Sequence, residues 1–169
     1  MNIFRIRHYT LSMAIAMLCF TNSAGAAPPD FNITLEAGLA CDFALSLDGW
    51  NGKGHFQEFK DKNGFIRSIS AGTGAALRFT NIETGKTFST KSNGAVSHTT
   101  TYSLDGSYVV SSTGHNVLIL FPTDIPAGPS TTLYVGKIVY SSDVNNNFTL
   151  QKASNNKTDI CAILSSQSQ

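Results

Sequence analysis

Side chains that could act as acids or bases are few in this sequence, and their spacing argues against a preformed catalytic group. Beyond the N-terminal segment the histidines are His55, His98 and His115, and none is spaced from a second His or Cys as in a zinc site. His115 and Asp124 flank one apolar run, but a strand of that length separates its ends by about 20–25 Å. We therefore expect no metal, no cofactor and no catalytic dyad.

Carboxylates leave one enzymatic alternative open. Two carboxylates on opposite sides of a glycosidic bond are the usual machinery of glycan hydrolysis. Glu58, Asp61 and Asp124 are the side chains that would serve if the fold brought two of them together in a cleft. A small secreted hydrolase, acting on glycans, is therefore the alternative to a protein without catalytic activity.

Two stretches carry residues suited to contact another molecule. Trp50 is the single tryptophan and precedes Asn51 in a glycine-rich stretch, where its ring could stack on a sugar or a partner protein, or fold back over the core. Asp124 and Ile125 lie in a loop that contains three prolines. Loops on a rigid scaffold often carry function, so we take these four residues as candidate contacts.

The first 26 residues predict a secretory signal peptide. Arg5 and Arg7 precede an apolar run from Leu11 to Phe20, and small residues end in Ala24-Gly25-Ala26. The run is shorter than the about 20 apolar residues that span a bilayer. We expect a mature chain from Ala27 with no membrane anchor after cleavage, located outside the cell or, in a Gram-negative host, in the periplasm.

Cys41 and Cys161 are the cysteines that remain after cleavage, and the secretory compartment allows oxidation. With two thiols one intramolecular pairing is possible, so we predict a Cys41–Cys161 disulfide that ties the first and last strands together. Asn32, Asn147 and Asn156 each begin a sequon and would accept N-glycans in a eukaryotic host.

Charge and composition exclude some partners. The formal net charge is +1, and removal of Arg5 and Arg7 with the leader leaves ten Lys and Arg against eleven Asp and Glu. The remaining lysines are scattered singly, whereas nucleic acids and anionic membranes require clustered basic residues. We expect neither as a partner.

Short alternating segments separated by turn residues predict an all-β fold. Phe31–Leu35 and Cys41–Leu47 alternate apolar with polar side chains, as strands do when one face covers a core. Val117–Phe121 and Thr131–Tyr140 are apolar on both faces and predict central strands covered on both sides. Two hairpins are expected, Ala75 to Thr90 and Val96 to Val110, the second closed by Asp105-Gly106.

These elements predict one antiparallel β-sandwich over residues 27–164, with a flattened β-barrel as the alternative, one disulfide and little or no helix. Polar residues 165–169 predict a disordered tail. The chain has one domain's worth of residues, and we expect a monomer.

Four segments carry a resemblance to other proteins. They are Phe79–Lys86, Gly114–Pro122, Val135–Val139 and Thr158–Cys161, and in that order they resemble a family of small secreted β-rich proteins of bacteria and filamentous fungi. The resemblance implies secretion, one β-rich domain and a cysteine near each end. It brings no activity, cofactor or catalytic residue with it.

A secreted, non-catalytic binding module is the function these features favour. Its loops would meet an extracellular protein or a glycan. Besides the hydrolase, a structural surface protein that associates through an edge strand is a further alternative.

Overall fold

The computed structural model describes residues 27–91 and 95–165. Within these ranges the chain forms strands and one short helix. The strands are β1 (Phe31–Leu35), β2 (Leu45–Trp50), β3 (Gly54–Lys60), β4 (Ile66–Thr73), β5 (Ala76–Asn81), β6 (Thr87–Thr90), β7 (Ala95–Tyr102), β8 (Tyr108–Thr113), β9 (His115–Leu120), β10 (Ser130–Val135), β11 (Ile138–Ser142), β12 (Phe148–Lys152) and β13 (Lys157–Asp159), and the helix is α1 (Ile160–Ser165). The predicted all-β fold with antiparallel sheets, one disulfide and little helix is confirmed, and none of the sheets closes into a barrel.

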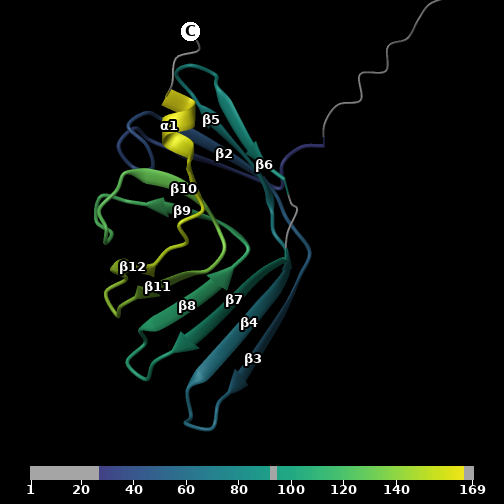
Figure 1. The fold of residues 1–169 in the computed structure, drawn as a ribbon, viewed down its shortest axis with the longest axis vertical. Helices are drawn as coiled ribbons and strands as arrows, with labels where there is room; N and C mark the ends of the chain where they lie inside the picture. Colours follow the sequence, from purple (N-terminus) through teal and green to yellow (C-terminus); the bar gives the residue numbers. More distant parts are fainter. Residues whose placement is uncertain (1–26, 92–94, 166–169) are drawn as a thin grey trace, which may run out of the picture.

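The upper sheet, at the top of Figure 1, contains β1, β2, β5 and β6 in that order. Its strands alternate as the sequence predicts: Leu45 and Leu47 of β2 are buried on the same face, and Leu47 pairs with the buried Phe79 of β5. Phe88 of β6 lies opposite Phe79, with ring centroids 6.4 Å apart. The predicted hairpin from Ala75 to Thr90 is therefore present.

The lower sheet has six strands in the order β12-β11-β8-β7-β4-β3 and fans out below the upper sheet in Figure 1. Its β7–β8 hairpin is the one predicted from Asp105-Gly106. Gly106 has φ +93°, which glycine adopts without strain. The Asp105 carboxylate accepts hydrogen bonds from the backbone N–H and the hydroxyl of Ser107, and so fixes the turn.

The middle sheet contains β13, β10 and β9, and Figure 1 shows β9 and β10 between the two larger sheets. One face of this sheet carries Val117, Ile119 and Leu133, which pack against the core of the upper sheet. The other face carries the buried Leu120 and Tyr134. β9 is therefore covered on both faces, as predicted for Val117–Phe121, although it is an edge strand of its sheet and not a central one.

Strands pass from one sheet to another at two bends. At the outer bend β2 continues into β3 through Gly52 while β4 continues into β5 through Gly74, so a pair of strands moves from one large sheet to the other. At the inner bend β8 continues into β9 through Gly114 while β10 continues into β11 through Gly136. Gly114 and Gly136 have φ +97° and +121°.

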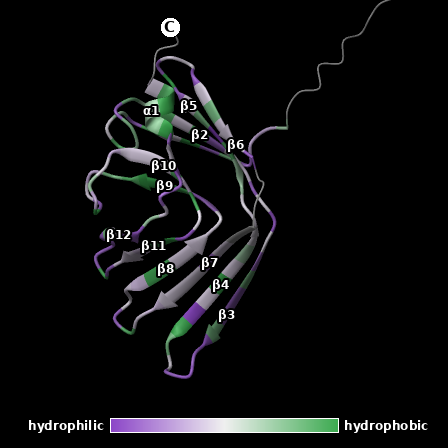
Figure 2. Ribbon diagram, in the orientation of Figure 1, coloured by the Kyte–Doolittle hydropathy of each residue, from purple (hydrophilic) through white to green (hydrophobic). Residues whose placement is uncertain are grey.

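The main core lies between the upper sheet, the middle sheet and α1. Its largest fully buried side chains include Phe79, Leu45, Ile160 and Leu164. Figure 2 shows the apolar colouring of α1 over this region. Because α1 has only six residues, this packing must hold it, since helices this short are unstable alone. The Asp159 carboxylate caps it by accepting a hydrogen bond from the N–H of Ala162 at 2.9 Å.

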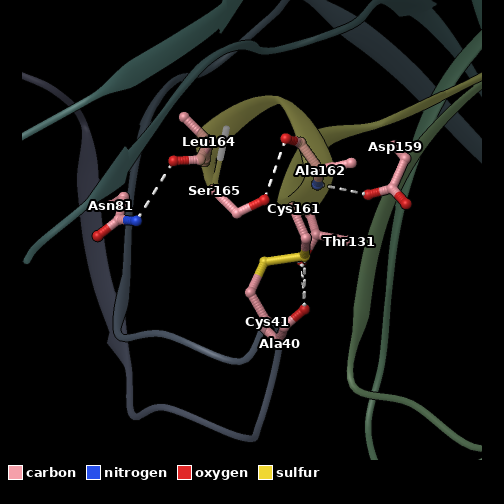
Figure 3. Close-up of a disulfide and its surroundings, with 9 residues drawn as sticks. All are labelled: Ala40, Cys41, Asn81, Thr131, Asp159, Cys161, Ala162, Leu164 and Ser165. Carbon is pink, nitrogen blue, oxygen red and sulfur yellow. Dashed lines mark hydrogen bonds between the residues drawn. A yellow bond between two sulfur atoms is a disulfide. The ribbon is translucent and has the colours of Figure 1, made fainter. Parts of the chain in front are cut away.

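The predicted disulfide between Cys41 and Cys161 is present, with a Cα–Cα distance of 5.5 Å (Figure 3). The elements that it joins differ from the prediction. Cys41 lies in the β1–β2 loop and Cys161 lies in α1, so the bond fixes the helix to that loop and does not join two strands. The Thr131 hydroxyl donates to the carbonyl of Ala40 at 3.0 Å and adds a link to the middle sheet.

Other boundaries also differ from the prediction. The strand expected from Cys41 begins only at Leu45, because residues 41–43 form bends. The strand expected from Thr131 to Tyr140 is two strands in two sheets, separated at Gly136. The predicted leader, residues 1–26, and most of the predicted tail, residues 166–169, lie outside the described residues. Within the described ranges, no helix has the length and apolar character needed to cross a membrane.

Candidate functional site

A cavity of about 250 Å³ lies between the two bends. Gly74 and Ala75 from the outer bend line one side, and His115 and Asn116 from the inner bend line another. Each bend is a place where two sheets diverge, so the space between the bends is not filled by sheet-on-sheet packing. The fold itself therefore positions this cavity, and the side chains around it come from all three sheets.

The cavity lies along the free edge of β9. His115, Asn116, Val117 and Leu118 all line it, although successive side chains of a strand point to opposite faces. Consecutive residues can share one cavity only if it meets the strand at its edge. In the described chain β9 pairs only with β10, and in an antiparallel ladder every second residue then directs its N–H and C=O away from the partner strand.

Basic groups and apolar side chains share the lining. Lys91, His98 and His115 are the basic residues of the lining, and none of the described lining residues carries a carboxylate. The apolar part of the lining includes Leu77, Val117, Leu133 and Ile138. The arrangement suits a ligand with an apolar body and an anionic group.

His98 is the basic group whose environment is most altered. It lies on β7, between Ser70 of β4 and Ser112 of β8 in the sheet register, and it is half-buried. Burial lowers the pKa of His98 below its ordinary value of 6.5. Tyr140, on β11, has its pKa raised above 10.0 by burial and then by the neighbouring Tyr108. Both groups are therefore neutral at pH 7.

Asn116 fixes the position of the inner bend beside the cavity. It is buried, and its side-chain oxygen accepts a hydrogen bond from the Ser112 hydroxyl. Its amide group donates to the carbonyls of Gly114 at 3.3 Å and Gly136 at 3.4 Å. One side chain thus joins β8, β9 and the β10–β11 turn, which holds His115 next to it in place.

Trp50 and Asn51 lie at the outer bend and are not among the residues that line the cavity. Trp50 is the last residue of β2, and the guanidinium carbon of Arg78 lies 5.4 Å from its ring centroid. Its indole N–H donates to the carbonyl of Ala27 at 3.1 Å. The backbone N–H of Asn51 donates to the Asp30 carboxylate at 2.6 Å. Trp50 therefore packs on Arg78, on the sheet face opposite to the one that carries Leu77.

Asp124 and Ile125 lie in the β9–β10 loop, on the opposite side of the molecule from the outer bend in Figure 1. The Asp124 carboxylate accepts a hydrogen bond from the N–H of Phe121 at 2.7 Å and closes the turn. The backbone of Ile125 pairs with β12, because its N–H donates to Phe148 and its C=O accepts from Leu150. The two candidate contact loops therefore do not form one surface.

None of the carboxylates of the hydrolase alternative lines the cavity. Asp61 is fixed in the β3–β4 turn, where it accepts hydrogen bonds from Asn63 and Phe65 and forms an ion pair with Arg67 at 3.0 Å. Glu58 is exposed on β3, and Asp124 is in the β9–β10 loop. In the described part of the chain, no three His, Cys, Asp or Glu side chains come together as a metal-binding group.

At two of the three predicted glycosylation sites the asparagine side chain donates a hydrogen bond to a carboxylate. The side-chain amide of Asn32 donates to the Asp48 carboxylate at 2.6 Å, and that of Asn147 donates to Asp143 at 2.7 Å. Asn156 is exposed and follows β12. A glycan on Asn32 or Asn147 would have to displace a hydrogen bond, so Asn156 is the most open of the three.

Comparison with known proteins identified no relative: no protein-family model, curated protein or solved structure matches the chain.

The cavity was not predicted from the sequence, although one signal was available. The β7–β8 hairpin turn sets His98 opposite Ser112, three residues before His115. The two histidines could therefore have been placed near each other from the hairpin register alone.

Proposed function

We propose that the protein is a secreted, non-catalytic binding module that takes an apolar carboxylate into the cavity between its two bends. The observation that carries this proposal is the lining itself, in which Lys91, His98 and His115 accompany apolar side chains and no carboxylate is found among the described residues. Concave sites that combine an apolar wall with a few polar groups are the usual form of ligand sites.

The chemistry of the lining favours an anion over a neutral ligand. Lys91 supplies an ammonium group, and the histidines supply ring N–H groups that can donate hydrogen bonds to an anion. A carboxylate next to His98 would stabilise its protonated form and so oppose the effect of burial on its pKa. Binding would then take up a proton and become tighter as the pH falls from 7.5 to 5.5.

Two sources could supply such a carboxylate: a free organic acid or the C-terminus of an extracellular polypeptide. The free edge of β9 fits the polypeptide, because an extended chain beside it could form main-chain hydrogen bonds as an added strand. The cavity volume of about 250 Å³ is slightly smaller than that of typical drug-sized sites, which suits one terminal side chain and its carboxylate.

Secretion is supported by the leader-like sequence of residues 1–26, by the resemblance to small secreted proteins, and by the Cys41–Cys161 disulfide, which is compatible with an oxidising compartment. A non-catalytic role is supported by the use that the fold makes of its carboxylates. Asp61, Asp105 and Asp124 each accept backbone hydrogen bonds in turns, where they hold loops in shape.

Isothermal titration calorimetry tests the proposal. The probes are hexanoate, 3-phenylpropanoate and their neutral amides, together with a short apolar peptide that ends in either a free carboxylate or an amide. We expect the acids to bind at least tenfold more tightly than the amides. If the peptide acid binds more tightly than the free acids, the polypeptide terminus is the source. Equal binding of acids and amides, or no binding, contradicts the proposal.

Matched variants locate the site. Lys91→Met and His115→Gln should each weaken binding of the acids about tenfold, since a hydrogen bond to a charged group contributes about 1.5–3 kcal/mol. His55→Gln is the control, because His55 lies on exposed β3 and does not line the cavity. If His55→Gln weakened binding as much as His115→Gln, the site would lie elsewhere.

A further inference from the structure

Strand β3 is an uncovered edge of the lower sheet. It runs from Gly54 to Lys60, pairs with β4 residue for residue along its whole length, and has no second neighbour among the described strands. All seven of its residues are exposed. It has neither a proline nor a β-bulge, which are two of the features that protect an edge strand from pairing with another chain, and its charged residues are Glu58 and Lys60.

The opposite edge of the same sheet is protected. The register between β11 and β12 shifts between Val139 and Tyr140, which marks an irregularity in the ladder. The backbone of Ile125 then covers the outer side of β12 with hydrogen bonds of 3.0 Å to Phe148 and 2.7 Å to Leu150. The chain therefore covers one edge of this sheet with its own loop and leaves the other open.

The open edge carries apolar side chains on both faces. Phe56 is 62% exposed and Phe59 is 40% exposed, and they point to opposite faces because they are three positions apart on the strand. Ile66 and Ile69 of the adjoining β4 are also exposed. Figure 2 shows apolar colouring near the free end of the β3–β4 hairpin, far from α1 and the main core.

We propose that β3 is an interaction surface for a second copy of this chain, and that the two β3 strands pair antiparallel about a two-fold axis at Gln57. Gln57 is the central residue of the seven-residue strand, so this register lets every residue of β3 find a partner. Phe56 would face Glu58 of the partner subunit, and His55 would face Phe59 of the partner subunit. The lower sheet would continue from one copy into the other.

Other symmetric registers are less favourable. A two-fold axis at Glu58 would place two carboxylates directly opposite each other, which is destabilising in a sheet. An axis at Phe56 would leave Phe59 and Lys60 beyond the end of the partner's strand. In the Gln57 register no like charges are directly opposite, because Lys60 faces Gly54 of the partner subunit. This self-complementarity favours a second copy over an unrelated strand, and closed two-fold pairs are the commonest oligomers.

This inference departs from the monomer expected from composition and is independent of the proposed ligand. The pairing surface is β3, whereas the cavity is lined by residues of the two bends, by Lys91 and by residues of β5, β6, β7, β9, β10 and β11. A dimer could therefore form whether or not the cavity binds carboxylates.

Sedimentation velocity measures the association directly. We expect the protein at low salt to form a dimer whose fraction rises with concentration. Gln57→Lys should weaken the dimer at least tenfold, because it places like charges directly opposite each other at the two-fold axis while the side chain stays exposed in the monomer. Gln151→Lys, on the covered strand β12, is the matched control and should leave the dimer unchanged.

Circular dichroism and the melting temperature of each variant establish that the fold is retained. A second measurement uses Gln57→Cys, which should form an interchain disulfide under mild oxidation, whereas Gln151→Cys should not. A protein that stays monomeric at all concentrations overturns the proposal. So does a dimer that Gln57→Lys leaves as stable as the parent.

Discussion

Gly52 and Thr73 approach each other so closely at the outer bend that a Cβ atom on Gly52 would clash with the carbonyl oxygen of Thr73. Beside this contact the backbone N–H of Thr73 donates to the carbonyl of Lys53 at 2.8 Å, and the N–H of Lys53 donates to the Thr73 hydroxyl at 2.8 Å. The two crossing strands therefore touch backbone to backbone at the point where they leave one sheet for the other.

Substitution of Gly52 by alanine should destabilise the fold by about 1–3 kcal/mol, the usual cost of forcing an extra carbon into a packed site. Gly54→Ala is the matched control in the same bend, because its nearest atom would be the Ala71 carbonyl oxygen at 3.6 Å, an ordinary contact. Urea unfolding of the two variants measures the difference. Equal midpoints would show that the strands can separate at the bend without cost.

Removal of the disulfide should cost about 2–5 kcal/mol, because the Cys41–Cys161 bond closes a loop with a sequence separation of 120. The double variant Cys41→Ser, Cys161→Ser should therefore melt at a clearly lower temperature than the parent. Dithiothreitol should lower the melting temperature of the parent and leave that of the double variant unchanged. If the parent melted at the same temperature with and without reductant, α1 would be held by packing alone.

His98 should make stability depend on pH. Burial disfavours its charged form, so the unfolded chain takes up this proton at a higher pH than the native protein does. His98 therefore leaves the free energy of unfolding at its full value above the unfolded pKa of about 6.5. The free energy of unfolding decreases as the pH falls below this value, and the decrease ends once the native imidazole is itself protonated. Lys91, His115 and Tyr140 share the cavity lining with His98, and no described lining residue is acidic.

Urea unfolding at pH 7.5, 6.5 and 5.5 measures this slope. His98→Gln should flatten the dependence, whatever its constant effect on packing. His55→Gln should leave the dependence as in the parent. A slope that His98→Gln does not change would assign the titration to another group.

Trp50 should report on the polar cluster of the upper sheet. Asp48 accepts hydrogen bonds from Arg78 at 2.6 and 2.9 Å, and hydrogen bonds from Arg78 and then Asn32 lower the pKa of Asp48. Asp48→Asn should release Arg78 from its place over the Trp50 ring, and acrylamide should then quench the fluorescence more strongly. Asp105→Asn, in the distant β7–β8 turn, is the control. Equal quenching of both variants would mean that Asp48 does not position Arg78.

Local patterns were sufficient to predict most elements. The β7–β8 hairpin followed from Asp105-Gly106, because those residues tolerate the backbone angles of a tight turn. The disulfide followed from the small number of cysteines. The inner bend could not be predicted, because the segment Thr131–Tyr140 carries apolar residues on both faces before and after Gly136 and so resembles one continuous strand. The single sign of the break is Gly136 with φ +121°, a backbone angle that a residue pattern does not report.

The candidate site was harder to predict because its parts are far apart in the chain. The register of the β7–β8 hairpin could have placed His98 and His115 near each other. Leu77, however, lies on β5 of the upper sheet, and Lys91 directly follows β6 of that sheet. Their distance from the histidines depends on the outer bend. Trp50 was selected as a candidate contact because it is the single tryptophan. Its position against Arg78 could not be predicted, because it depends on a pairing between β2 and β5 that spans some thirty residues.

The main core lies almost wholly between the upper sheet, the middle sheet and α1, whereas every residue of β3 is exposed. Stability should therefore be unevenly distributed over the molecule. In native-state hydrogen exchange, amides of β2 and β5 should exchange only through global unfolding. Amides of β3 and β4 should exchange through a local opening that has a lower free energy. The half of the molecule that carries the open edge is thus the half that can rearrange while the rest stays folded.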